Sequence, residues 1–64
     1  MLRFTKIEAN KALEDHGLNW ESPLIDIIDT LTDALEDHYL RQGVGVDVDE
    51  LIERATTLAN LWAK

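Results

Sequence analysis

Two copies of the pentapeptide Ala-Leu-Glu-Asp-His, at positions 12–16 and 34–38, hold the residues of this chain most able to do chemistry. An aspartate beside a histidine can ligate a divalent metal or transfer protons. Neighbouring side chains on a helix, however, point about 100° apart, which suits two ligands of one ion poorly. The flanking residues also differ between the copies, so they do not form a structural repeat. We interpret each copy as the end of a helix and predict no metal ligand and no cofactor.

No other combination of residues favours catalysis. Ser22 is the only serine, and its place before a proline is typical of a helix N-cap rather than a nucleophile. The Gly43-x-Gly45 segment is too short for a phosphate-binding loop, and the acids that follow it would repel phosphate. A chain of 64 residues has little volume for a substrate cleft. The sequence therefore predicts no catalytic residue and a protein that is not an enzyme.

Composition and charge narrow the class of partner. The chain has 13 acids against 6 Lys and Arg, a net charge of −7 and no cysteine. Because the cations are few and scattered, we expect no direct binding of nucleic acid or of an anionic membrane. No apolar run reaches the roughly 18–20 residues of a membrane span, and the first residues do not resemble a secretion signal. We expect a single small helical domain over 1–64, in the cytoplasm of a bacterium or of a phage-infected cell.

Three segments have the periodicity of helices, and they cover about 5–16, 23–42 and 47–63. Glycine and proline are rare; the glycines fall between these segments, and the one proline begins the second segment. No segment shows the alternation expected of a half-buried strand, because the Val44–Val48 stretch contains glycine and leads at once into a capping signal. The fold class predicted is all-α, a three-helix unit in which the second and third helices form an antiparallel hairpin.

Capping residues define the expected ends of these helices. Thr5 and the glutamate three residues later fit a capping box, and Gly17 is the usual residue for a left-handed C-terminal cap. Ser22 is expected to be the N-cap of the second helix, with proline at its first position, and Gly43 is expected to end that helix. Asp47 is expected to cap the third helix, again with a glutamate three residues later.

Each segment has an apolar face that must be buried. On the second segment it consists of Leu24, Ile27, Ile28, Leu31, Leu35 and Tyr39. On the third it consists of Val48, Leu51, Ile52, Ala55, Leu58, Ala59 and Trp62. On the first it is thinner, with Leu2, Ala9, Ala12 and Leu13, and with His16 beside them. Phe4 and Ile7 point elsewhere, so the alternative is that the first five or six residues are extended. A core this small rarely stabilises a monomer well, so we expect a homodimer.

The opposite face of the second segment is acidic. Asp26, Asp29, Asp33 and Asp37 recur about once per helical turn, which spaces their carboxylates by about 5.4 Å. The simplest interpretation is a solvated helix face. Two large apolar residues, Ile25 and Leu40, lie on the same polar half and would be exposed there.

These residues support two hypotheses about function. The leading hypothesis is a small acidic module or regulator that binds another protein. The alternative is a nucleic-acid-mimicking inhibitor of a DNA- or RNA-binding protein, of the kind a phage or plasmid encodes. The candidate partner-binding residues are Asp26, Asp29, Asp33, Asp37, Leu40 and Trp20. Trp20 is included because tryptophan is enriched at the energetic centres of interfaces.

His38 falls on the apolar face of the second segment. We expect it to be half-buried and hydrogen-bonded inside the monomer. The alternative is a pH-sensitive contact across the dimer, because histidine changes its charge near neutral pH.

Overall fold

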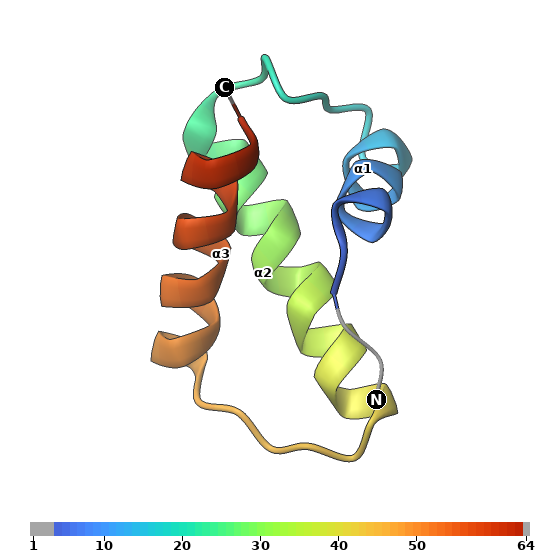
Figure 1. Cartoon of the computed structure of the whole chain (residues 1–64), viewed down its shortest axis with the longest axis vertical. Coiled ribbons are helices and arrows are strands. Elements are labelled where there is room, and N and C mark those ends of the chain that lie inside the picture. The colour runs from blue at the N-terminus through green and yellow to red at the C-terminus, as the bar shows by residue number, and fades with distance from the viewer. Residues whose placement is uncertain (1–3, 64) are drawn as a thin grey trace.

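The computed structural model describes residues 4–63, and these form three α-helices with no strand among them. The helices are α1 (Lys6–Asp15), α2 (Leu24–Arg41) and α3 (Val48–Trp62). α2 runs the length of the molecule, with α3 antiparallel beside it and α1 packed on it as well (Figure 1). The predicted all-α fold, its three helices and its α2–α3 hairpin are confirmed. None of the described helices is long and apolar enough to span a bilayer.

Both glycine caps are present where the sequence predicts them. Gly17 and Gly43 have φ angles of +71° and +72°, a left-handed conformation that glycine adopts without strain. After α1, the amide of Leu18 donates to the carbonyl of Leu13 at 2.7 Å. After α2, the amide of Val44 donates to the carbonyl of Tyr39 at 2.9 Å. Each bond closes a Schellman motif, so both helices end at a defined residue.

The helix starts follow the prediction less closely. Thr5 caps α1, because its hydroxyl accepts from the amide of Glu8 at 3.4 Å. The prediction that Ser22 caps α2 is wrong: the N-cap is Pro23, in an extended conformation, and α2 begins one residue later. The Ser22 hydroxyl instead accepts from the amide of Asn19 at 3.0 Å and stabilises the preceding turn. Asp47 does occupy the N-cap position of α3, but its side chain makes no capping bond.

The core lies on one side of α2, between α1 and α3. The core consists of Ala9, Leu13, Ile27, Leu31, Leu35, Leu51, Ala55 and Ala59. Its three α2 residues follow the i, i+4, i+8 spacing that aligns side chains along a helix. Three of the core residues are alanines, whose small side chains allow close approach of the helix backbones. Thr30, which the apolar pattern does not include, is buried beside them at 6% exposure.

The edges of the predicted apolar faces differ from the prediction. Leu24, Val48 and Ile52 are exposed, at 42%, 63% and 44%. Leu24 and Val48 are the first residues of their helices. Ile52 follows Leu51 and so lies about 100° from the buried row of α3. His16 is exposed as well, and Leu2 lies outside the described residues. The half-buried members of the predicted faces, which pack against the core, are Ile28, Tyr39, Leu58 and Trp62.

At the start of the described chain, one of the two apolar residues expected to point away from the core is instead packed against it. Ile7 points away from the core as predicted, at 79% exposure. Phe4, expected to do the same, is half-buried and packs against the core. Its ring meets that of His38 on α2, and the backbone at Thr5, which follows it, is extended, so Phe4 does not follow the helical pattern of α1.

Replacement of Leu31 by alanine tests whether this row holds the fold together. Leu31 is fully buried at 0% exposure, so Leu31→Ala should lower the free energy of unfolding by about 2–4 kcal/mol. A core of this size supplies only about 3–5 kcal/mol in total, so the variant should keep only a small part of the original stability. Urea denaturation followed by circular dichroism measures the change. Leu61→Ala is the matched control, since Leu61 is 64% exposed. Equal effects of the two substitutions would contradict the assigned core.

Candidate functional site

The side of α2 that faces away from α1 and α3 is the candidate functional site, and we call it the outward face. Its seven residues follow from the helical repeat of 100° per residue and are all exposed. They are Ile25, Asp26, Asp29, Asp33, Glu36, Asp37 and Leu40. Ile25 and Leu40, near the two ends of the face, are 69% and 68% exposed. The structure therefore brings together five of the six candidate partner-binding residues.

Very little positive charge compensates the outward face. Arg41 is the only Lys or Arg on α2, and its guanidinium lies 3.0 Å from the carboxylate of Asp37. Within residues 4–63, no cationic group lies within ion-pair distance of Asp26, Asp29 or Asp33. All 13 acids of the chain are exposed, so the negative charge is carried on the surface and is available to a partner.

The arrangement of these acids opposes folding of α2. Like charges three or four residues apart on a helix each cost about 0.2–0.5 kcal/mol. Asp33 takes part in three such pairs, with Asp29, Glu36 and Asp37. Only Asp26 lies in the first turn, where the helix dipole favours a negative charge. The acids in the middle of the outward face therefore have no stabilising role in α2.

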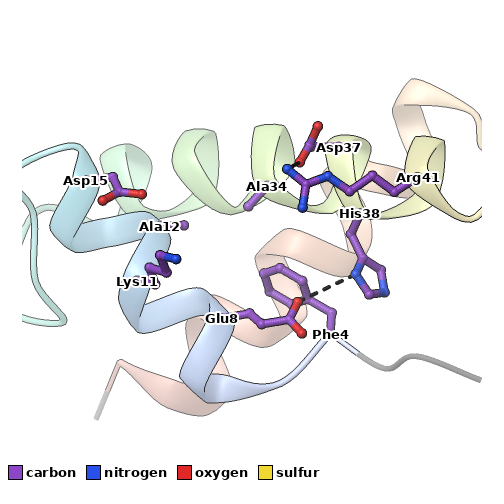
Figure 2. Close-up of a pocket in the computed structure, with 9 residues that line it drawn as sticks. All are labelled: Phe4, Glu8, Lys11, Ala12, Asp15, Ala34, Asp37, His38 and Arg41. Atoms are coloured by element: carbon purple, nitrogen blue, oxygen red, sulfur yellow. Dashed lines mark ion pairs between the residues drawn. The ribbon is translucent and has the colours of Figure 1, made fainter.

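The two Ala-Leu-Glu-Asp-His copies meet at a pocket of about 400 Å³ between α1 and α2 (Figure 2). Ala12 from the first copy and Ala34 from the second lie in its lining, and the leucine of each copy is in the core. The first copy ends α1 as predicted, whereas the second lies within α2, with its histidine in the last turn. The repeated pentapeptide thus packs the two helices against each other.

Four of the polar side chains that line this pocket form two pairs. Asp37 pairs with Arg41, while the neighbouring His38 turns the other way, toward Glu8 (Figure 2). The two side chains diverge, as expected for adjacent residues on a helix. Across residues 4–63, no three carboxylate or imidazole side chains are grouped so that they could hold one metal ion. Lys11 and Asp15 line the pocket without an ion pair to any described residue.

His38 links α2 to α1 and to the residue before Thr5 through side-chain contacts. Its side chain is 11% exposed, its Nδ1 lies 3.5 Å from a Glu8 carboxylate oxygen, and its Nε2 lies 3.1 Å from the Gln42 side-chain nitrogen. The ring meets Phe4 and Tyr39 edge-on, with centroids 5.7 Å and 5.6 Å apart. The prediction of a half-buried, hydrogen-bonded histidine is confirmed. The Phe4–His38–Glu8 cluster itself has no sequence signal, because His38 lies far along the chain from Phe4 and Glu8.

Trp20, the sixth candidate, lies apart from the outward face. It is half-buried in the linker before α2, and its ring meets Trp62 edge-on at 6.0 Å. Its indole nitrogen donates to the side-chain oxygen of Asn10, and the Lys6 ammonium lies 5.9 Å from the ring centroid. These contacts tie the linker to α1 and α3, so Trp20 has a packing role within the chain.

Comparison with known proteins assigns this chain to no family. No family model, curated protein or solved structure matches this chain.

Neutralising Asp33 tests whether the outward face costs stability. Asp33→Asn removes three like-charge pairs at little change in helix propensity, so it should raise the free energy of unfolding by about 0.5–1 kcal/mol at low salt. Asp26→Asn is the control on the same face. It removes one such pair but also a favourable dipole interaction, so its effect should be near zero. Urea denaturation at low and high salt measures both. A loss of stability for Asp33→Asn would show that the aspartate is structural.

Proposed function

We propose that this protein acts by binding another protein, without catalysis of its own, through the outward face of α2. The observation that carries the proposal is a helix face of five acids and two large apolar residues that no part of the described chain covers. The acids in the middle of the face repel one another, and a natural protein tends to keep such a cost where function needs it. As the site of action we propose the cytoplasm of a bacterium or a phage-infected cell.

The exposed apolar residues support the hypothesis that the outward face binds a partner, rather than the hypothesis that its charges only keep the protein in solution. Among residues 4–63, eight apolar residues are buried in the core, three of them alanines, and eight large hydrophobic side chains remain exposed. Single exposed apolar residues are ordinary. A leucine and an isoleucine exposed on the most acidic face of the chain, however, are poorly explained by solubility, which charged residues alone would supply.

A second candidate is mimicry of nucleic acid, and the spacing of the acids favours it. From Asp26 to Asp37 the helix rises by about 16 Å, and this length carries five acids, or about one charge per 4 Å. One strand of DNA carries a charge per about 3.4 Å. The outward face thus approaches the charge density of a single strand, and the partner would be a DNA- or RNA-binding protein whose groove the face occupies.

Capture of a partner from a lysate of the source organism tests the proposal and separates the two candidates. The chain is immobilised, and bound proteins are identified by mass spectrometry. For an interface with apolar anchors, Leu40→Ala should abolish capture, and capture should persist at high salt. For mimicry, the combined change of Asp26, Asp29, Asp33 and Asp37 to Asn should abolish it, and high salt should do the same, since salt screens exposed charges.

The control for Leu40→Ala is Leu61→Ala, which removes an equally exposed leucine from α3. A captured protein counts only if it is lost with an outward-face variant and kept with this control. If no protein meets that test at either salt concentration, the proposed function is wrong.

Self-association is a further part of the proposal. The core faces of α1, α2 and α3 pack against one another within one chain, so a homodimer would have to use apolar residues that this packing leaves exposed, such as Val48 and Ile52 of α3. Because each copy carries a charge of −7, high salt should favour the dimer by screening the repulsion between copies. Size-exclusion chromatography with light scattering should give twice the chain mass at micromolar concentration in high salt. A monomer at all salt concentrations would exclude the homodimer.

A further inference from the structure

The centre of the outward face is a continuous stripe that runs along α2. It consists of Ile25, Asp29, Asp33, Glu36 and Leu40, at spacings of four, four, three and four residues. Residues spaced by three and four follow one another along a single side of a helix. The stripe rises by about 22 Å from Ile25 to Leu40, because an α-helix rises about 1.5 Å per residue. It is apolar at both ends and acidic in between.

We propose that this stripe receives a helix of the partner protein, with Lys or Arg in its central turns and apolar side chains near both ends. The inference rests on the proposed function and specifies the kind of partner. Residues spaced by three and four form the single line along a helix on which a second helix packs. A partner helix of about 15 residues would span the 22 Å of the stripe.

Charge complementarity selects a cationic partner. Asp29 and Asp33 have no ion pair with any described residue, and Glu36 has none either. The one cation on α2, Arg41, is held by Asp37, which lies beside the stripe and not in it. The three acids of the stripe would therefore meet the cations of a partner without competition from α2 itself, and a nucleic acid, being anionic, is excluded as the occupant.

A second copy of this chain does not fit the stripe. Two copies in parallel would place Asp29, Asp33 and Glu36 against the same acids of the neighbour. The acids lie near the midpoint between Ile25 and Leu40, so an antiparallel arrangement would bring them together again. Like charges directly opposed across an interface are strongly unfavourable, so the occupant is a different protein.

The apolar ends favour a protein helix that packs along the stripe over a groove that recognises phosphates alone. A phosphate-binding groove uses cations and hydrogen-bond donors and gives no contact to Ile25 or Leu40. A helix with apolar residues near both ends would cover these two side chains, which are more than two-thirds exposed in the free chain. Burial of both side chains also sets the register of the two helices.

A designed peptide tests the stripe directly. The probe is a helical peptide with leucine near both ends of one face and three lysines between them, and its binding is measured by NMR titration of the full chain. Chemical-shift changes should cluster on the outward face of α2. The affinity should fall about tenfold for Leu40→Ala, as expected for an apolar anchor. It should fall by a similar factor for the triple variant Asp29→Asn, Asp33→Asn, Glu36→Gln, since three exposed ion pairs together reach that factor.

Two matched variants control for charge and for leucine content. Glu14→Gln, Glu21→Gln, Glu53→Gln removes three exposed acids elsewhere, and Leu61→Ala removes an exposed leucine from α3. Both should bind the probe like the unmodified chain. Circular dichroism confirms that each variant is folded, which is expected because every substituted residue is exposed. A second peptide of the same composition, with its lysines and leucines on opposite faces, should bind about tenfold more weakly.

The inference is overturned if the rearranged peptide binds equally well, if the control triple weakens binding as much, or if the shifts map to another surface. If a cellular protein is captured through the outward face while the probe fails to bind, the inference fails and the proposed function stands. If neither occurs, both are wrong.

Discussion

The packing of α2 against both other helices is the interaction on which the rest of the structure depends. Ile27, Leu31 and Leu35 form one row on α2 that is buried between α1 and α3. Because a helix rotates about 100° per residue, burial of this row turns the residues half a turn from it away from α1 and α3, and these residues are exposed. The position of the outward face is therefore a direct consequence of the core, and the same helix holds the fold and presents the candidate binding surface.

Contacts at the helix ends and in the linker support this arrangement. Glycine caps end α1 and α2 at defined residues, and the His38–Glu8 and Trp20–Trp62 contacts tie the first helix and the linker to the rest. A core with three alanines among its eight residues leaves a small margin of stability. Against that margin, the repulsion among the acids of α2 is a sizeable cost.

A binding surface on a packed helix has a physical advantage over one on a loop. The backbone of α2 is already ordered by the core, so binding along the outward face would order only side chains. The charge of the face would accelerate the encounter with a cationic partner, and its two apolar ends would slow dissociation. The pocket between α1 and α2 contributes less, because its polar groups largely pair within the chain.

The sequence alone determined the three helices, the glycine ends of α1 and α2, and the acidic side of α2, because helical periodicity and capping are properties of neighbouring residues. Only the tertiary structure decided which members of each apolar face are buried: Leu24, Val48 and Ile52 are not, whereas Thr30 and Phe4 are packed inward. The tertiary structure also shows that Ser22 stabilises the turn before α2 instead of capping the helix, and that Trp20 packs against Trp62. Burial at the edge of a helix depends on where the next helix lies, and contacts such as Phe4 with His38 join residues far apart in the chain, which no local pattern records.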